Sequence, residues 1–186
     1  MLLLPFWLDA LGVFVFAVSG ALVASRKQLD ILGFVFVASV TGIGGGTLRD
    51  LLLGRQIFWI EAPEYLYATT AAAVLVYFTA HLVERRYTVL VWADAIGLAL
   101  FSVLGARIAL LAGTSPSVAV LMGVITATAG GLIRDVACGE RPLILAREIY
   151  ATAAVLGSGV TVALLLLDVP DMGAEAAGLA AALGAR

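Results

Sequence analysis

Gly-Gly-Thr-Leu-Arg-Asp, at residues 45–50, is matched by Gly-Gly-Leu-Ile-Arg-Asp at residues 130–135, an offset of 85 residues. The same offset, without a gap, aligns seven further identical pairs: Asp9 with Asp94, Gly12 with Gly97, Phe16 with Phe101, Gly20 with Gly105, Thr41 with Thr126, Gly54 with Gly139 and Tyr65 with Tyr150. We infer that one ancestral unit was duplicated and that both copies kept this motif.

The composition is that of a membrane protein. Hydrophobic residues make up 62% of the 186 residues and the mean hydropathy is +1.08, whereas soluble domains contain roughly 45–50% apolar residues. A spanning helix needs about 20 mostly apolar residues, so the chain can supply six or seven spans and no soluble domain. The net charge of −2 and the absence of a basic tail argue against a nucleic-acid partner.

Apolar runs separated by charged and turn residues predict seven transmembrane helices. The expected spans are residues 6–25, 31–53, 65–83, 89–112, 117–138 and 147–167, followed by a shorter Ala-rich segment at about 172–186. We therefore predict an all-α membrane protein in which residues 1–186 form a single transmembrane domain.

Basic residues are distributed unequally between the two sets of loops. One set contains Arg26, Lys27, Arg85, Arg86, Arg141, Arg147 and Arg186, whereas the other has chiefly Arg55, with Arg49 and Arg107 just inside their spans. Because cytoplasmic loops carry the excess of lysine and arginine, the first set is predicted to be cytoplasmic. The N-terminus then lies outside and the C-terminus inside, which requires an odd number of spans and supports the seventh.

Each copy of the repeat contains three expected spans, over residues 6–83 and 89–167. Because three is odd, the second copy enters the membrane from the opposite face, and the repeats are predicted to be inverted. Inverted repeats recur in transporters, where the substrate site lies at the repeat interface. The pattern is compatible with a channel and with a carrier.

Four glycines within residues 41–46 precede Arg49. Glycine costs about 1 kcal/mol relative to alanine in a helix, so we predict a break or a sharp kink in the second span and a weaker one in the fifth. Thr47 and Asp50 have the spacing of a capping box that would restart the helix after the break. The alternative is close helix packing, because small residues let membrane helices approach one another.

Arg49 and Arg134 are charged residues within apolar spans. A charge at the centre of a spanning helix costs at least about 2.5–3.5 kcal/mol, so both are expected to face the bundle interior. Adjacent helical side chains point about 100° apart, so we expect each arginine to find a partner on another helix rather than to neutralise Asp50 or Asp135. The alternatives are an Arg–Asp network that only ties helices together and an arginine that extends to the interface.

Asp9 and Asp94 begin the first expected span of each copy. They are interpreted as partners of the helix N-terminal dipole, with polar lining at a pore mouth as the alternative. Ser19, Thr41 and Thr126 place hydroxyl groups within the spans, where such groups usually bond to the backbone of their own helix.

Neither a nucleophile with its base and oxyanion hole nor a phosphate-binding loop occurs in the sequence, so we expect neither an enzyme nor a cofactor. The one histidine, His81, argues against a histidine-based metal site. The single Cys138 excludes an internal disulfide.

The two glycine-rich stretches, with Gly54 and Gly139, resemble the prokaryotic branch of the trimeric intracellular cation (TRIC) channel family over nearly the whole chain. The resemblance implies a homotrimer in the plasma (inner) membrane, with one pore in each protomer. It also implies passage of monovalent cations, mainly potassium, through a pore lined by the first two helices of each repeat. The implied partners are membrane lipids, transient potassium ions and copies of the chain itself, with no bound metal.

Carried onto this chain, the resemblance predicts a constriction and gate at the glycine breaks, with hydroxyl groups in the lining. The residues are Gly44, Gly45, Gly46, Arg49, Asp50, Gly130, Gly131, Arg134, Asp135, Ser19, Thr41 and Thr126. Because arginine raises an electrostatic barrier to cations, the aspartates would have to offset it and the arginines would act as a gate or latch.

Two other functions fit the residues. A secondary carrier of a small solute such as glycine also uses inverted repeats and an inward polar constriction, and bacterial relatives have been labelled glycine transporters. A scaffold or lipid-binding membrane protein would leave the duplicated Arg–Asp pair with a structural role alone.

Overall fold

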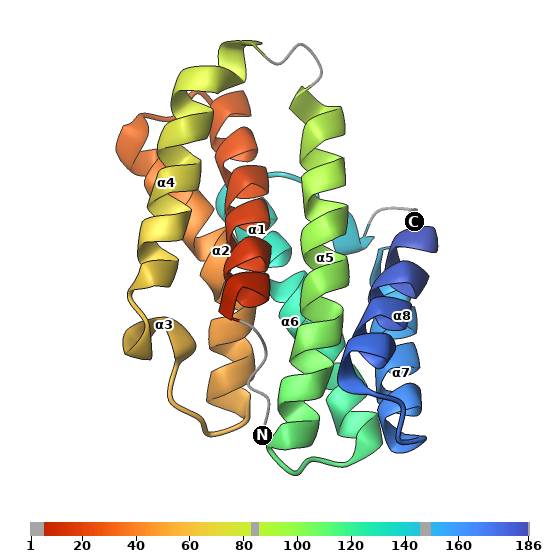
Figure 1. Ribbon diagram of the computed structural model, residues 1–186. Helices are drawn as coiled ribbons and strands as arrows, with labels where there is room; N and C mark the ends of the chain where they lie inside the picture. The colour runs from red at the N-terminus through yellow and green to blue at the C-terminus, as the bar shows by residue number, and fades with distance from the viewer. Residues whose placement is uncertain (1–5, 83–85, 146–149, 186) are drawn as a thin grey trace.

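The computed structural model describes residues 6–82, 86–145 and 150–185, and the regular secondary structure of these residues is helical (Figure 1). In chain order the helices are α1 (Phe6–Arg26), α2 (Ile31–Leu52), α3 (Phe58–Glu61), α4 (Glu64–Thr79), η1 (Ala80–Leu82), α5 (Arg86–Leu111), α6 (Pro116–Ala137), η2 (Leu143–Leu145), α7 (Ala151–Leu166) and α8 (Asp171–Gly184).

The helices lie within a few residues of the expected spans. Five helical segments are long and apolar enough to cross a bilayer: α1, α2, α4 with η1, α5 and α6. Helix α7 has 16 residues and α8 has 14, which correspond to lengths of about 24 and 21 Å at 1.5 Å per residue. Of the basic residues used to predict orientation, Arg85, Arg147 and Arg186 lie outside the described residues.

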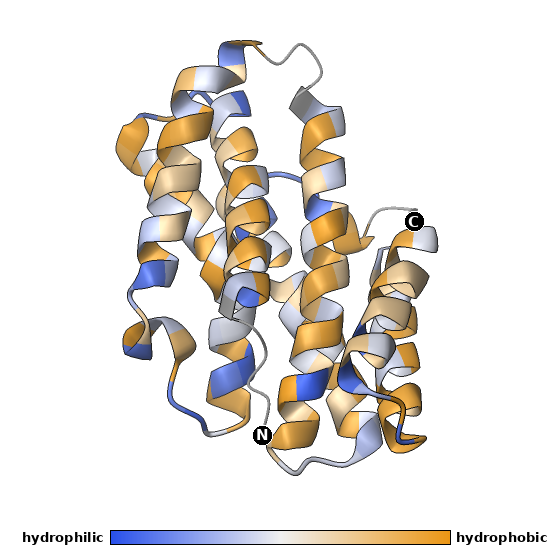
Figure 2. Cartoon of the chain, in the orientation of Figure 1, coloured by the Kyte–Doolittle hydropathy of each residue, from blue (hydrophilic) through white to orange (hydrophobic). Residues whose placement is uncertain are grey.

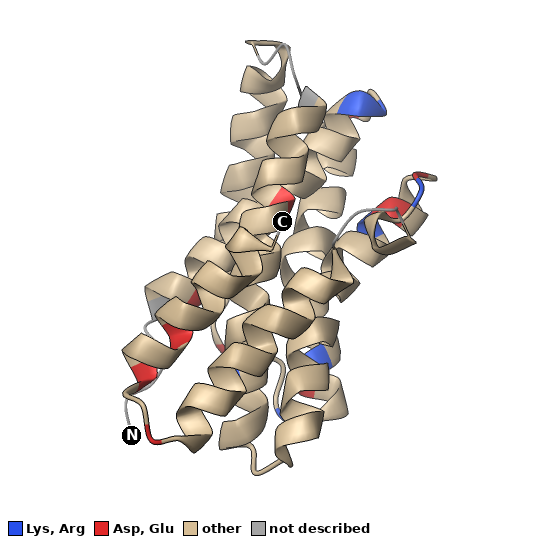
Figure 3. Cartoon of the chain, turned by 90° about the vertical axis from the view of Figure 1, so that its right-hand side faces the viewer, with Lys and Arg blue, Asp and Glu red and all other residues tan. Residues whose placement is uncertain are grey.

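The surface agrees with a membrane environment. Hydrophobic residues run along the length of the helices, and hydrophilic residues gather mainly near helix ends and connections (Figure 2). A second view shows that most of the helical ribbon consists of uncharged residues (Figure 3). Large apolar side chains are correspondingly exposed, with Leu32, Phe36 and Trp92 more than half accessible. The protein is therefore an integral, multi-pass, all-helical membrane protein.

Glycine ends both motif-bearing helices. Gly54 follows α2 with φ of 63° and Gly139 follows α6 with φ of 61°, a left-handed conformation that suits a residue without a side chain. The next backbone amide, from Arg55 or Glu140, then donates to a carbonyl five residues earlier, at 2.9 and 2.8 Å. This arrangement satisfies carbonyls that a helix terminus would otherwise leave unpaired.

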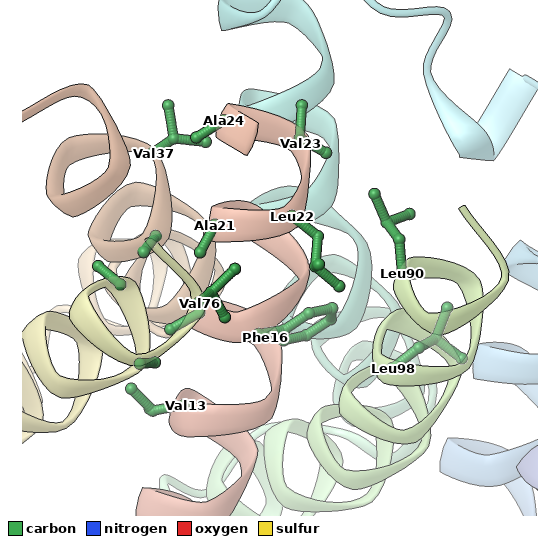
Figure 4. Packing of buried hydrophobic residues seen from close by; sticks show 14 of the residues in the cluster. Val13, Phe16, Ala21, Leu22, Val23, Ala24, Val37, Val76, Leu90 and Leu98 are labelled. Carbon is green, nitrogen blue, oxygen red and sulfur yellow. The ribbon is translucent and has the colours of Figure 1, made fainter. Parts of the chain in front are cut away.

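Helices α1 and α5 form the centre of the bundle, with α4 on one side and α7 with α8 on the other (Figure 1). Phe16 and Phe101 stack between them with ring centroids 5.3 Å apart. A Cβ added to Gly97 would come 2.8 Å from the Phe16 ring, and one added to Gly12 would come 3.1 Å from the Phe101 ring. Phe16 also points toward Leu98 of α5 (Figure 4). The two glycines thus make room for the two rings.

Ion pairs attach α8 to the centre of the bundle. Arg107 of α5 is buried, donates from Nη2 to Asp171 Oδ2 at 2.6 Å, and donates from Nη1 to Glu175. The sequence interpretation of Arg107 as a residue near a span end did not include these partners. Because two carboxylates of one helix contact one guanidinium, α8 is held against α5 as well as against α7.

Candidate functional site

Helices α2 and α6 cross at their glycines. A Cβ added to Gly45 would overlap the carbonyl oxygen of Thr126, and a Cβ added to Gly130 would overlap the carbonyl oxygen of Thr41. Gly44 lies at the edge of the same crossing, where an added Cβ would be 3.7 Å from the Cα of Gly130. The contact is reciprocal and joins backbone to backbone, so no side chain larger than hydrogen fits at its centre.

Of the break or kink predicted at these glycines, the break is wrong. Helix α2 runs without interruption from Ile31 to Leu52, and α6 runs from Pro116 to Ala137. The helix penalty of glycine, about 1 kcal/mol, is smaller than the several kcal/mol that an unsatisfied backbone group costs in a membrane. Close helix packing, the alternative drawn from the sequence, describes the observed arrangement. Two continuous helices cross where the sequence predicts interrupted ones.

The in-span hydroxyl groups bond to their own helices, as predicted. Ser19 donates to the carbonyl oxygen of Phe16 at 2.8 Å, and Thr41 and Thr126 donate to carbonyl oxygens one turn earlier at 2.6 Å. Small residues of the neighbouring helix make room for the threonines. A Cβ added to Gly20 or Gly105 would come 2.5 Å from the Oγ1 of Thr41 or Thr126, respectively.

Arg134 lies four residues after the crossing glycine of α6 and is 1% exposed. Its Nε donates to Asp135 Oδ1 at 2.8 Å, and its Nη1 donates to Asp94 Oδ1 of α5 at 2.7 Å and to Ser19 Oγ of α1 at 2.8 Å. Arg134 Nη2 has no hydrogen-bond partner among the described residues. One guanidinium therefore links three helices through two carboxylates and a hydroxyl group. We call these four residues the Arg134 corner.

Arg49 lies four residues after the crossing glycine of α2 and is 2% exposed. Its Nε and Nη2 each lie 2.8 Å from Asp50 Oδ1, and its Cζ lies 5.7 Å from the centroid of the Phe58 ring. Asp9 of α1 is within electrostatic range of Arg49 but accepts its hydrogen bond from Tyr65, at 2.9 Å. Arg49 Nη1 has no hydrogen-bond partner in the described part of the chain. We call these five residues the Arg49 corner.

The expectation that neighbouring arginine and aspartate would not pair is wrong at both corners. The arginine side chain is long and flexible enough to curve around the helix to the carboxylate of the next residue, and a buried cation is strongly attracted to the nearest carboxylate. The expectation of a partner on another helix is confirmed for Arg134, which reaches Asp94 and Ser19. For Arg49 the contact outside α2 is a ring, that of Phe58.

Each aspartate also holds a short turn of chain beyond its own helix. Asp50 Oδ2 accepts a hydrogen bond from the backbone amide of Phe58 at 3.0 Å, and Asp135 Oδ2 accepts one from the amide of Leu143 at 2.9 Å. These amides begin α3 and η2, so each Arg–Asp pair fixes the turn that follows its helix. The two corners lie on opposite sides of the crossing because α2 and α6 run antiparallel through it (Figure 1).

The predicted capping box is likewise wrong. Asp50 caps α3 rather than α2, and Thr47 Oγ1 donates to the carbonyl oxygen of Ile43 at 2.7 Å. The same Oγ1 accepts a hydrogen bond from Nε1 of Trp59 at 2.9 Å. Because α2 is unbroken, the amides that a capping box would satisfy are already bonded within the helix.

The interpretation of Asp94 as a partner of a helix N-terminus is wrong. Helix α5 begins at Arg86, which places Asp94 more than two turns inside it, fully buried against Arg134. Asp9 does lie in the first turn of α1, where a negative charge is favourable.

A cavity of about 180 Å³ lies where α1 and α6 end. Its charged and polar lining consists of Arg26, Tyr87, Arg134, Asp135, Glu140 and Arg141. At the exposed rim of the cavity, Glu140 Oε1 lies 3.1 Å from Lys27 Nζ and 3.8 Å from Arg26 Nη2. The cavity thus leads from an exposed charged rim to the Arg134 corner.

Sequence reasoning missed Phe58 and Leu143, which carry the amides bound by the two aspartates. They are separated by the same offset of 85 residues as the motif. One is aromatic and the other aliphatic, so a comparison of identical residues does not identify them. The sequence identifies Tyr65 as a member of the repeat but gives it no role; in the structure its hydroxyl group donates a hydrogen bond to Asp9.

These features define a class: a helical membrane protein with a close helix crossing and two buried Arg–Asp corners. The model of the family described as Glycine transporter matches the chain in two segments, residues 6–81 and 91–165. The chain belongs to this family. The resemblance to the prokaryotic TRIC family is confirmed by the solved structures that the chain matches.

One solved structure is the TRIC trimeric intracellular cation channel orthologue from Rhodobacter sphaeroides, with 53% identity and a TM-score of 0.93 over 95% of this chain and 92% of that chain. A prokaryotic TRIC channel solved in 0.5 M KCl has 29% identity and a TM-score of 0.90 over 95% and 90%. The UPF0126 membrane protein of Vibrio cholerae is 44% identical over 83% of this chain, which spans 65% of that relative. The UPF0126 inner membrane protein YadS of Escherichia coli K12 is 41% identical, over 83% and 76%.

Proposed function

We propose that this protein is a cation channel, chiefly for potassium, with one pore in each protomer of a homotrimer in the inner membrane. The observation that carries the proposal is the charge of the two corners. Arg134 contacts two carboxylates, and Arg49 contacts one and lies in range of a second. With these carboxylates ionised, each corner has a net negative charge inside an apolar bundle, which favours a cation over an anion. The similarity to proteins described as cation channels supports the same conclusion.

The corners also answer the objection that arginine opposes cation passage. Each guanidinium is neutralised by a carboxylate at 2.8 Å, so its charge does not stand alone in the path. A carrier of glycine has in its favour the description of the family, but the solved relatives that match over most of the chain are described as channels.

We propose further that the chain consists of two inverted three-helix repeats and a seventh helix, with the N-terminus outside. The family model matches two segments whose starts are offset by 85 residues, and α2 and α6 have bounds with the same offset. The matched helices α1 and α5 run in opposite directions (Figure 1). Repeats of three spans would produce this reversal.

In this proposal the constriction is the crossing of Gly44, Gly45 and Gly130, and the gate is the set of bonds that hold α1, α2, α5 and α6 around it. The backbones are in contact at the crossing, where even an added Cβ would not fit, so conduction requires α2 and α6 to move apart. The Arg134 corner resists that movement because it ties α6 to α1 and α5. The predicted role of the arginine as a latch then applies most strongly to Arg134.

The test is recording from purified protein in planar bilayers with KCl. We expect discrete currents whose reversal potential follows the potassium gradient. Arg134→Ala should raise the open probability by more than about tenfold, since a charge-assisted hydrogen bond contributes about 1.5–3 kcal/mol. Ser19→Ala, which removes one bond of the latch without changing charge, should raise it less, and Arg134→Lys should lie between Arg134→Ala and the parent.

Two outcomes would overturn the proposal in different ways. Saturable glycine uptake into proteoliposomes without discrete currents would replace the channel by a carrier. Discrete currents with parent-like gating in both Arg134→Ala and Ser19→Ala would keep the channel and refute the latch. If Arg134→Ala does not fold, Ser19→Ala alone decides the question.

A further inference from the structure

The mouth formed by the ends of α1 and α6 is rich in positive charge. Arg26 and Arg141 line the cavity there, and Lys27 stands beside them. In the described residues no carboxylate lies within ion-pair distance of Arg141, and its side chain is exposed. A mouth of this composition repels cations, which conflicts with the passage of cations to the Arg134 corner.

Glu140 is the carboxylate at the rim of this mouth. It follows the glycine that ends α6, and its side chain, 27% exposed, reaches across to Lys27 and Arg26 at the end of α1. Arg26 is turned toward Tyr87 as well, with its Cζ 5.3 Å from the ring centroid. Glu140 therefore places one negative charge against Arg26 and Lys27, the two basic residues where α1 ends.

The opposite end of the bundle has the reverse charge at the aligned position. The residue offset from Glu140 by 85 positions is Arg55, which is exposed, and those aligned with Arg26 and Lys27 are Leu111 and Ala112. The repeat therefore does not account for Glu140: the second copy has a carboxylate where the first has a guanidinium. Among the described residues, three basic side chains gather at the α1–α6 mouth, so a carboxylate at this end lowers the electrostatic barrier to cations.

We propose that Glu140 is the residue that determines charge selectivity at this mouth, because it offsets Arg26, Lys27 and Arg141 and so admits cations to the cavity that leads to Arg134. The proposal rests on the proposed channel function. It assigns to Glu140 a role that a merely structural ion pair would not have. In a structural pair, loss of either partner has the same consequence, whereas here the two partners have opposite effects on a cation.

Three variants distinguish these readings in single-channel recordings at low ionic strength. Glu140→Gln should lower the cation conductance and the ratio of potassium to chloride permeability about three- to fivefold at 50 mM KCl. Lys27→Gln should change both quantities in the opposite direction, by a similar or smaller factor. Glu64→Gln, which removes an exposed carboxylate at the start of α4, at the other end of the bundle, is the matched control and should leave the parent values unchanged.

Salt provides the second readout. The Debye length falls from about 10 Å at 0.1 M to about 3 Å at 1 M, so the difference between Glu140→Gln and the parent should vanish at 1 M KCl. If Glu140→Gln and Lys27→Gln change conductance in the same direction, or if Glu140→Gln behaves as the parent at 50 mM, the proposal is wrong. A parent that carries no current would refute the channel function itself, which separates the failure of the two proposals.

Discussion

The two corners share a motif but differ in how completely their charges are paired. At the Arg134 corner the guanidinium bonds to Asp135, Asp94 and Ser19 on three helices. At the Arg49 corner the guanidinium bonds to its neighbour Asp50, while Asp9, which aligns with Asp94, bonds to Tyr65 instead. One corner is therefore a junction between helices, and the other is a local pair covered by an aromatic ring.

The difference follows from where the two aligned aspartates stand in their helices. Helix α5 begins at Arg86, so Asp94 lies well inside it and is fully buried. Helix α1 begins at Phe6, so Asp9 stands in the first turn and is partly exposed. A few residues of helix length thus decide whether a repeated carboxylate reaches the arginine or turns toward a tyrosine. Identical residues at aligned positions of the two repeats therefore need not contribute equally to the free energy of unfolding.

Removal of the two aligned carboxylates, one at a time, should produce the largest difference in unfolding free energy between the corners. Asp94→Ala leaves Arg134 with a buried, partly unpaired charge, which costs about 3–5 kcal/mol of unfolding free energy. Asp9→Ala removes one hydrogen bond to Tyr65 at a partly exposed site and should cost about 1–2 kcal/mol. Thermal unfolding of the purified protein in detergent would measure both, and equal losses would show that the corners are energetically equivalent after all.

Replacement of the aligned glycines by alanine should reverse the order, with the larger loss of stability at the Arg49 corner. A Cβ at Gly46 would come 2.6 Å from the Phe58 ring, which is fixed edge-on against Tyr65 with centroids 4.7 Å apart. A Cβ at Gly131 would come 3.0 Å from the hydroxyl oxygen of Tyr150, the end of a longer side chain. Gly46→Ala should therefore cost about 1–3 kcal/mol, the usual range for overpacking, and Gly131→Ala less than about 1 kcal/mol.

The same unfolding measurement tests this pair, since both substitutions add one methyl group to a helical glycine. A greater loss for Gly131→Ala would contradict the assignment of the tighter packing to the Arg49 corner. Gly130→Ala is a useful reference because its Cβ would meet the backbone of Thr41, and its cost should exceed that of both.

Hydropathy predicted the helices because the membrane imposes their length and apolar composition on the sequence directly. Helix propensity, in contrast, was wrong in predicting breaks at the glycines of α2 and α6. Glycine destabilises an isolated helix, but packing reverses that cost when another backbone comes within contact distance. The offset of 85 residues identified Thr41 and Thr126 as a pair. Nothing in the sequence showed that each would supply the carbonyl oxygen that meets the glycine of the other copy.

The charged residues show a second limit of sequence reasoning. That Arg49 and Arg134 face inward followed from the cost of a charge in lipid. Their partners did not follow, because a partner depends on the length of α5, on the fold of the turn at Phe58 and on the flexibility of the arginine itself. Spacing along one helix cannot specify contacts made between helices.

The smallest contrast concerns how the turn after each helix is anchored. At the Arg49 corner, α3 is held by Asp50 and also by the bond from Trp59 Nε1 to Thr47 Oγ1. The residue aligned with Thr47 is Leu132, so η2 lacks that second bond and depends on Asp135. Thr47→Val keeps the shape of the side chain and removes the acceptor, which should cost about 1 kcal/mol.

The matched control is Leu132→Val, which alters the aligned position without a hydrogen bond to lose and should change the unfolding midpoint less. The indole N–H signal of Trp59 in an NMR spectrum provides an independent readout, because loss of its acceptor should shift that signal and speed its exchange with solvent. An unchanged signal in Thr47→Val would mean that the Asp50 bond alone holds α3. The two turns would then be anchored alike, and the asymmetry of the corners would reduce to the choice of partner for each arginine.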